Sequence, residues 1–391
     1  MFHVKHSEDP LDHLPGAIAE LERRGLFRQP ADAISPDALS FCSNDYLGLA
    51  AAKAPPSPSG SGSSRLISGE RDEHRRLERA LAEWLHVEDV LVFTSGYCAN
   101  VGTVSALAGP ADVVVSDALN HASLIDGIRL SKARVVITPH RNLQAIDGAL
   151  ASRTEERAWV IVESYYSMDA DGPDLAALRG ICDARGAALI VDDAHAIGVL
   201  GPGGRGLCAE AGIAPDVLVG TLGKSLGSQG AFVAGRAVLR KWLWNRARSF
   251  VFSTGLAPCA AAAALRSLET LQRTPDIGAR VQDLAVRLRR GLLAAGAAEG
   301  PSGGPPSVRA PQLLGFGHVV PVVIGTPEEA VHLANIAKAN GIHVQAIRPP
   351  TVPEGTARLR LTVTARHTEQ DIDRAIDVLR SALHQTGSLP E

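Results

Sequence analysis

The sequence predicts an α/β protein built on a mostly parallel, seven-stranded sheet with helices on both faces, continuing into a smaller C-terminal α/β domain. Three observations support this fold class. The 391 residues are more than one hydrophobic core usually serves. Between residues 89 and 235, short apolar runs alternate with amphipathic helical patterns, as in parallel sheets covered on both faces. The runs lack polar alternation, which predicts strands buried on both sides.

The strands and helices of the large sheet follow one another regularly. The predicted strands are Asp89–Phe93, Val113–Ser116, Arg134–Thr138, Trp159–Val162, Ala187–Asp192, Val217–Gly220 and Ala231–Ala234. Amphipathic spacing predicts helices at Glu73–His86, Ala122–Ser131, Leu143–Ser152 and Leu175–Arg185. Ahead of them we expect a short helix at Ile18–Gly25 and a loop, rich in Pro, Ser and Gly, from Lys53 to Gly69.

The C-terminal part begins with a long helical pattern from about Pro258 to Ala297, which ends at a Gly/Pro break over Gly300–Pro306. The smaller α/β unit then has predicted strands near Val319–Ile324, His343–Ala346 and Arg358–Leu361 and helices near Pro327–Asn340 and Glu369–Leu383. We therefore expect an N-terminal segment (1–50), a large domain (51–270) and a small domain (271–391).

Composition excludes several classes of protein. Hydrophobic residues make up 45% and charged residues 21%, a globular balance, and the formal net charge of −3 gives no general attraction to nucleic acid or anionic lipid. We find no targeting segment and no apolar run near the ~20 residues of a membrane helix, and expect a cytoplasmic protein. The five cysteines lack a Cys-x-x-Cys pair, which favours reduced core thiols over disulfides or zinc.

Lys224 is the first candidate for chemistry. Six of the 39 Lys and Arg residues are lysines, and Lys224 is the one that falls between two predicted buried strands. Its loop contains Gly223, Gly227 and Gly230, which allow close approach of the backbone to a ligand. A lysine that forms a Schiff base needs a partly desolvated site, because it then loses its proton more easily. Taken alone, the loop is equally compatible with a lysine extending from a surface turn.

Asp192 and His195 follow another buried strand, at the edge where ligands bind in open α/β sheets. A carboxylate there can pair with the protonated ring nitrogen of a cofactor such as pyridoxal phosphate and keep the ring electron-withdrawing. His195 could hydrogen-bond the ring hydroxyl. The alternative is an Asp-x-x-His metal site, which no further ligand cluster in the sequence supports, so no metal is predicted.

Two further turns each follow a strand and open a helix. Residues 94–100 include Gly96 and Tyr97, whose backbone N–H groups would face a phosphate at the positive end of a helix dipole. His121 opens the next helix and could stack over a cofactor ring. The Gly/Ser stretch at 60–65 lacks the Gly-Lys-Ser/Thr ending of a nucleotide loop and follows no strand, which argues against a nucleotide triphosphate site.

In these motifs the chain resembles the α-oxoamine synthase family of fold-type-I pyridoxal-phosphate enzymes, from Ser43–Leu49 (SNDYLGL) to about Arg380. The resemblance implies that Lys224 carries the cofactor and moves protons, and that His121 stacks on the ring. It assigns cofactor contacts to Gly96, Tyr97, Ser167, Asp192, His195, Thr221 and, from the other subunit, Thr254. It assigns substrate contacts to Arg28, Asn44, His121, Arg348, Thr351 and Arg360, with Arg360 binding the amino-acid carboxylate.

Residues 347–362 (IRPPTVPEGTARLRLT) indicate one branch of this family. The segment resembles that of the enzymes that condense L-alanine with a pimeloyl thioester and release carbon dioxide. The resemblance implies pyridoxal 5′-phosphate as cofactor, L-alanine and pimeloyl-CoA or pimeloyl-ACP as substrates, and a homodimer with active sites at the subunit interface. The alternatives are another family member, such as a glycine C-acetyltransferase, and a non-catalytic regulatory homologue that binds the cofactor. An aminotransferase is a weaker alternative, because the residues of its motifs differ from those found here.

Overall fold

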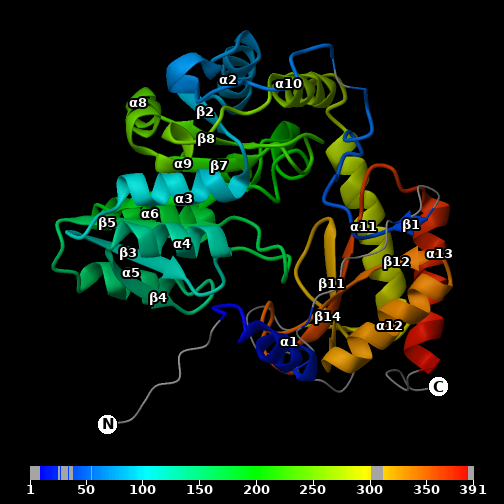
Figure 1. The fold of residues 1–391 in the computed structure, drawn as a ribbon. Helices are drawn as coiled ribbons and strands as arrows, with labels where there is room; N and C mark the ends of the chain where they lie inside the picture. Colours follow the sequence, from blue (N-terminus) through cyan, green and yellow to red (C-terminus); the bar gives the residue numbers. More distant parts are fainter. Residues whose placement is uncertain are drawn as a thin grey trace.

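The large sheet confirms the predicted core. The structure, a computed structural model, describes residues 9–24, 27, 34, 38–53, 55–300 and 311–385 (Figure 1). Seven strands lie in the order β2-β8-β7-β6-β5-β3-β4. They are β2 (Asp89–Phe93), β3 (Asp112–Asp117), β4 (Arg134–Thr138), β5 (Arg157–Glu163), β6 (Ala188–Asp192), β7 (Val217–Thr221) and β8 (Ala231–Gly235). β8 is antiparallel to both of its neighbours, and the other pairs are parallel.

Helices cover both faces of this sheet because neighbouring strand residues point to opposite sides. Leu91 and Ile161 belong to one hydrophobic cluster, whereas Val90 and Val160 belong to the other. The first face packs against α3 (Gly96–Leu107), α4 (Ala122–Ser131), α8 (Ala237–Arg246) and α9 (Arg248–Val251). The second packs against α2 (Asp72–Leu85), α5 (Leu143–Ala151), α6 (Leu175–Arg185) and α10 (Pro258–Arg273). The short α7 (Leu207–Glu210) follows β6 in the chain.

Strand β4 departs from the expectation that every strand is buried on both sides. It is the last strand of the sheet, and Val135 and Ile137 are 41% and 70% exposed. The apolar run gave the strand correctly, but the prediction of burial was wrong, because a sequence pattern does not say which strand lies at the edge.

The small domain contains a second sheet in the order β13-β14-β11-β10-β9. Its strands are β9 (Ala298–Glu299), β10 (Gln312–Leu313), β11 (Val319–Gly325), β13 (Gln345–Ile347) and β14 (Ala357–Thr362), with helices α12 (Pro327–Ala339) and α13 (Glu369–Gln385). The strand predicted at His343–Ala346 is in fact two, because β12 (Ile342–His343) leaves this sheet to pair in parallel with β1 (Leu39–Ser40). In Figure 1 the blue β1 accordingly lies among orange and red elements.

Two other predictions near the domain boundaries need adjustment. The helical stretch predicted from Pro258 to Ala297 is divided into α10 and α11 (Ile277–Ala294), and the break contains Pro275, which has no N–H to continue a helix. The N-terminal helix α1 spans Leu14–Arg23, shifted from the predicted Ile18–Gly25, and Gly25 lies outside the described residues. Most of the predicted break at Gly300–Pro306 also lies outside them.

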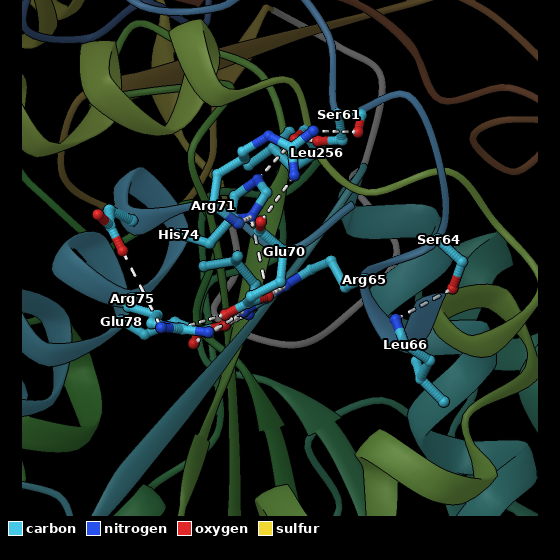
Figure 2. A network of polar contacts seen from close by, with 12 residues as sticks. Ser61, Ser64, Arg65, Leu66, Glu70, Arg71, His74, Arg75, Glu78 and Leu256 are labelled. Carbon is cyan, nitrogen blue, oxygen red and sulfur yellow. Dashed lines mark hydrogen bonds and ion pairs between the residues drawn. The ribbon is translucent and has the colours of Figure 1, made fainter. Parts of the chain in front are cut away.

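The predicted loop 53–69 is fixed by a buried polar network and ends in one π-helical turn, Arg65–Gly69 (Figure 2). Arg65 Nη1 lies 2.5 Å from Glu78 Oε1, and its Nε lies 2.5 Å from Glu70 Oε2. His74 Nε2 bonds the carbonyl of Leu256 at 2.6 Å, and Ser61 Oγ donates to the same oxygen. The loop and the segment around Leu256 are therefore held together, although they are nearly 200 residues apart in the chain.

Arg358 and Arg360 fasten the small domain to the large one. They stand two residues apart on β14 and so share a face of the sheet. Arg358 forms a salt bridge with Asp169, and Arg360 Nε donates to the carbonyl oxygen of Ser167 at 2.8 Å. The small domain is thereby anchored beside the carboxyl end of β5.

Two further properties of the described residues bear on the predictions. No helix among them is long and apolar enough to cross a membrane. All five cysteines are unpaired; Cys182 and Cys208 are buried as predicted, whereas Cys42, Cys98 and Cys259 are half-buried and not core thiols.

Candidate active site

The predicted site residues meet along the carboxyl edge of the large sheet. Asp192 ends β6, Thr221 ends β7, and the helices after β2 and β3 begin there with Gly96 and Ala122. Parallel strands place their carboxyl ends at one edge, where the connections leave room for ligands. Glu163, at the end of β5, pairs in register with Asp192 and adds a carboxyl group that the sequence analysis did not select.

Lys224 occupies a tight loop that leaves it half-buried. The amide of Gly227 donates to the carbonyl of Lys224 at 2.8 Å. Gly227 has a φ of 54°, and a Cβ there would lie 2.4 Å from the backbone nitrogen of Ala50, so the close approach requires glycine. Burial lowers the pKa of Lys224, while Asp192 and Glu163 oppose the shift. The lysine is therefore no surface group, and its amine loses a proton more easily than an ordinary lysine does.

Asp192 is held by two hydrogen bonds that fix its carboxylate. Its Oδ2 accepts from Asn100 Nδ2 at 2.7 Å, and its Oδ1 accepts from the backbone N–H of Ala194 at 3.0 Å. The side chain is almost buried, and no group of three or more His, Cys, Asp or Glu in the described chain is placed to hold a metal. An oriented carboxylate of this kind suits a protonated ring nitrogen.

His195 is a half-buried imidazole whose surroundings favour its neutral form. Its Nδ1 lies 2.6 Å from the hydroxyl of Tyr46. Burial, together with the positive charges of Lys224 and Arg360, keeps the pKa of His195 well below its usual value. The ring can therefore donate one hydrogen bond while it accepts another.

His121 stands at the N-terminus of α4 and is held by three groups. Its backbone N–H donates to Glu163 Oε1 at 2.6 Å. Its Nδ1 accepts from the backbone N–H of Ser123 at 3.2 Å and lies 2.7 Å from Ser123 Oγ. Because Asn100 donates to that same Ser123 oxygen at 2.9 Å, one chain of hydrogen bonds links His121 to Asp192. Burial lowers the pKa of His121, which favours a neutral ring.

Glu163 is a second buried carboxyl group beside these residues. Burial, strengthened by the charge of Asp192, raises the pKa of Glu163 to about 8. At neutral pH the raised pKa of Glu163 favours its protonated form.

Arg360 is a buried guanidinium whose hydrogen bonds all go to neutral acceptors. Its Nε donates to the Ser167 carbonyl, its Nη1 to Thr362 Oγ1 at 3.2 Å, and its Nη2 to Asn44 Oδ1 at 3.2 Å. Among the described residues it forms no salt bridge, whereas Arg358 on the same face pairs with Asp169. A buried cation without a carboxylate partner is costly, so the site is suited to a carboxylate ligand.

The beginning of α3 offers free donors for a phosphate. Ser95 Oγ accepts from the N–H of Cys98 at 3.1 Å, whereas the N–H groups of Gly96 and Tyr97, at the first two helical positions, have no acceptor within the helix. A Cβ at Gly96 would meet nothing within 4 Å in the described chain. Thr221 lies at the end of β7, where its Oγ1 donates to the Gly230 carbonyl at 3.2 Å. Space and donors fit a phosphate group.

A cavity of about 1390 Å³ opens next to His121, between the edge of the large sheet and the small domain. Ser167 and Thr351, both predicted site residues, line it together with Glu163. Lys224 and Asp192 lie outside its wall. The cavity could hold a long substrate that reaches the reacting groups past His121.

The remaining predicted residues have different outcomes. Arg348 is half-buried just after β13, and Thr254 is exposed in the loop that follows α9. The structure describes one chain, so a contribution of Thr254 to a neighbouring subunit stays a prediction. Tyr97 directs its hydroxyl to Asp126 on α4, and its side chain is exposed, so any contact with a phosphate would be made by its backbone N–H. Arg28 lies outside the described residues.

Asn100 and Tyr46 are functional residues that sequence reasoning missed, since they hold the two predicted side chains Asp192 and His195. Both stand inside motifs that the sequence analysis used, residues 94–100 and 43–49. An amide one helical turn after a phosphate loop was the available signal for Asn100. Nothing local indicated that Tyr46 bonds a histidine 149 positions away.

Known proteins are similar to this chain in fold and in sequence. Residues 36–379 match the family described as aminotransferase class I and II. The 8-amino-7-oxononanoate synthase of Mycolicibacterium smegmatis is 44% identical over 377 residues, which cover 93% of this chain and 94% of the relative. The structure of Sphingomonas wittichii serine palmitoyltransferase has a TM-score of 0.88 at 28% identity, covering 98% and 100% of the two chains. That of 8-amino-7-oxononanoate synthase from Francisella tularensis has a TM-score of 0.73 at 25% identity, covering 90% and 99%.

The fold and the site define a fold-type-I enzyme whose cofactor is pyridoxal phosphate. The half-buried Lys224 with its lowered pKa, the oriented Asp192 and the free amides at the start of α3 fit that group. The chain belongs to the aminotransferase class I and II family and, within it, to the 8-amino-7-oxononanoate synthases, which are acyltransferases.

Proposed function

We propose that this enzyme condenses L-alanine with a pimeloyl thioester, carried on coenzyme A or on an acyl carrier protein, and gives 8-amino-7-oxononanoate, carbon dioxide and the free thiol for biotin synthesis in the cytoplasm. The observation that carries the proposal is Arg360: a buried guanidinium, bonded to Asn44, without an acidic partner among the described residues. Guanidinium binds carboxylate through two parallel hydrogen bonds, which also orients it. An amino acid held in this way has its α-carbon in a defined position.

Pyridoxal phosphate, when bound, supplies the electron sink for negative charge on the α-carbon. Lys224 would hold it covalently, with Asp192 at the ring nitrogen and His195 and Ser167 around the ring hydroxyl. His121 would cover the ring, and Gly96, Tyr97 and Thr221 would bind the phosphate. We propose that Thr254 of a second copy completes the phosphate site, so that the active form is a homodimer.

Lys224 and Arg360 divide the work on the amino acid. The lowered pKa of Lys224 makes a neutral Nζ easier to reach, and this amine removes the α-proton. Arg360 holds the carboxylate until carbon–carbon bond formation has made a β-keto acid, whose carboxylate then leaves as carbon dioxide. Lys224 then returns a proton to the α-carbon. The same amine therefore acts first as the base and then as the acid.

The acyl substrate would enter the cavity beside His121. The wall includes Ser167 and Thr351, and we propose that Asn44, Arg348 and Arg28 also contact the acyl side. The cavity volume of about 1390 Å³ is sufficient for a pimeloyl chain, and we propose that the thioester is directed at the α-carbon.

A substrate matrix tests the proposed function. Purified enzyme is incubated with L-alanine or glycine and with pimeloyl-CoA, pimeloyl-ACP or acetyl-CoA, and product mass and carbon dioxide release are measured. We expect turnover with L-alanine and a pimeloyl thioester and none with Lys224→Ala. Lys241→Ala, an exposed lysine on α8, is the control and should match wild type. Turnover with glycine alone, or cofactor binding without any turnover, would contradict the proposal.

Light scattering tests the proposed assembly. We expect the holoenzyme to have twice the chain mass. Thr254→Ala should weaken cofactor binding, measured as the dissociation constant of pyridoxal phosphate by equilibrium titration. A fully active particle of one chain mass would refute the shared site.

A further inference from the structure

Tyr46 lies where the cofactor side and the substrate side of the site meet. It is fully buried, in the loop after β1. Its hydroxyl oxygen lies 2.6 Å from His195 Nδ1 and 3.3 Å from Asn44 Oδ1. Asn44 Oδ1 in turn accepts from Arg360 Nη2 at 3.2 Å. The Tyr46 hydroxyl therefore contacts both His195, the proposed partner of the cofactor's ring hydroxyl, and Asn44. Asn44 in turn contacts Arg360, the proposed carboxylate-binding residue.

The hydroxyl has one proton, which it can donate to Asn44 Oδ1 or, where Nδ1 carries no proton, to His195 Nδ1. Burial raises the pKa of Tyr46 to about 12, although Arg360 opposes the shift, so the group is a neutral phenol. Asn44 Oδ1 already accepts from the Arg360 cation, and its distance from the phenol is the longer one. The shorter distance, to His195 Nδ1, marks the stronger hydrogen bond.

The direction of this bond determines the tautomer of His195. A neutral imidazole has one N–H, and if Nδ1 accepts a hydrogen bond the proton must be on Nε2. An Nε2–H can donate to an oxygen on the opposite side of the ring from Tyr46. The reversed tautomer would leave Nε2 without a proton and unable to donate to a ring hydroxyl or its anion.

We propose that Tyr46 is the positioning residue that fixes His195 in its Nε2–H tautomer and, through Asn44, sets the position of Arg360. The tautomer part depends on the contacts of this chain alone. The part about Arg360 rests on the proposed function, because it assumes that the bound carboxylate is that of L-alanine.

Tyr165 provides a matched comparison. It is equally buried and packs against the same neighbour as Tyr46: the ring of His318 lies 4.2 Å from the ring of Tyr46 and 5.4 Å from that of Tyr165, measured between centroids. Its hydroxyl, however, donates to the carbonyl of Phe316 at 2.5 Å. Tyr165→Phe therefore removes a buried hydroxyl near His318 and leaves the contacts of His195 and Asn44 in place.

The tautomer is read directly by nitrogen NMR of holoenzyme labelled with ¹⁵N-histidine, with the His195 signals assigned by their loss in His195→Gln. We expect the Nε2–H form in wild type and in Tyr165→Phe, and a mixture or the Nδ1–H form in Tyr46→Phe. Thermal unfolding of each variant shows whether it is folded. An Nδ1–H wild type, or an unchanged tautomer in folded Tyr46→Phe, would overturn the proposal.

Asn44→Ala separates the effect on Arg360 from the effect on the His195 tautomer. It also provides a test if Tyr46→Phe fails to fold. It should leave His195 in the Nε2–H form and raise the KM for L-alanine about tenfold, the effect of losing one such hydrogen bond of ~1.4 kcal/mol. Tyr46→Phe should both raise that KM and lower kcat. If the KM for L-alanine is unchanged in both variants while the tautomer behaves as expected, only the part of the proposal about Arg360 is refuted. If no amino acid is turned over by wild type, the proposed function fails while the tautomer result stands by itself.

Discussion

At the scale of single residues, the site depends on neutral side chains that hold charged ones. Asn100 joins Asp192 to Ser123, and Ser123 joins this pair to His121. Asp192 and His121, for which we propose contacts with the ring nitrogen and the ring face, therefore belong to one chain of hydrogen bonds. The amide nitrogen of Asn100 makes the bonds to both Asp192 and Ser123, while its Oδ1 has no hydrogen-bond partner among the described residues.

Asn100→Ala should lower kcat about 10- to 100-fold, because Asp192 Oδ2 loses its partner and a buried hydrogen bond to a charged group contributes ~1.5–3 kcal/mol. Cofactor affinity should fall as well. Steady-state kinetics and titration with pyridoxal phosphate measure the two effects. Asn142→Ala, which removes the cap of α5 away from the site, should change stability and leave kcat as it is. Equal kcat values for Asn100→Ala and wild type would show that Asp192 is oriented by other means.

The sequence allowed Lys224, Asp192, His121 and His195 to be predicted, because each follows a strand whose apolar run is easy to recognise and strand ends meet at one edge. The residues that hold them could not be predicted in the same way. Asn100 and Asp192 are 92 positions apart, and their contact depends on the order of strands in the sheet. That order is decided by packing and not by any local pattern.

At the scale of elements, the network around Arg65 shows how a loop without regular structure is made rigid. Arg65 forms salt bridges with both Glu70 and Glu78, and its side chain is 1% exposed. Its guanidinium carbon also lies 5.2 Å from the ring centroid of Trp244, on α8. The composition of 53–69 correctly indicated a loop, but it does not show the π-helical turn or the salt bridges of Arg65, one of which reaches Glu78 on α2.

Arg65→Ala should lower the free energy of unfolding by ~3–5 kcal/mol, because Glu78 and Glu70 lose a buried partner. Arg75 is the matched control: it pairs with the same Glu70 at 3.0 Å, but its side chain is 59% exposed. Arg75→Ala should cost less than ~1 kcal/mol, as exposed pairs do. Urea unfolding of both variants makes the comparison. Similar losses for the two would show that burial does not set the strength of this network.

At the scale of the whole molecule, buried groups with raised pKa values make stability depend on pH. His140 lies between Asp117 and Asp171, at 2.9 Å and 3.1 Å. Burial disfavours its charged form, but the two carboxylates outweigh burial and raise the pKa of His140 to about 9. In the unfolded chain a histidine loses its proton near pH 6.5. The folded state therefore binds the extra proton between these values, and its contribution to stability is complete below pH 6.5 and lost as the pH rises to about 9.

His140→Gln should flatten the decline in stability between pH 6.5 and 9, by at most ~3 kcal/mol across that interval. The difference between the wild-type and variant curves isolates His140 from Glu163 and Asp193, whose raised pKa values of about 8 and about 7 also make stability fall with rising pH. Unfolding in urea at several pH values gives the curves. His332→Gln, at an exposed position of α12, should keep the wild-type slope. A wild-type curve that is flat from pH 6.5 to 9 would rule out a protonated His140 between the two carboxylates.

The central claim is that Lys224 moves the α-proton of an amino acid held by Arg360, and exchange of that proton tests it most directly. Holoenzyme is incubated with L-alanine in D₂O without any thioester, and deuterium at the α-carbon is followed by NMR. We predict exchange in wild type and in Lys241→Ala, none in Lys224→Ala, and exchange in Arg360→Lys only at much higher alanine concentration. Exchange by Lys224→Ala at the wild-type rate would contradict the account.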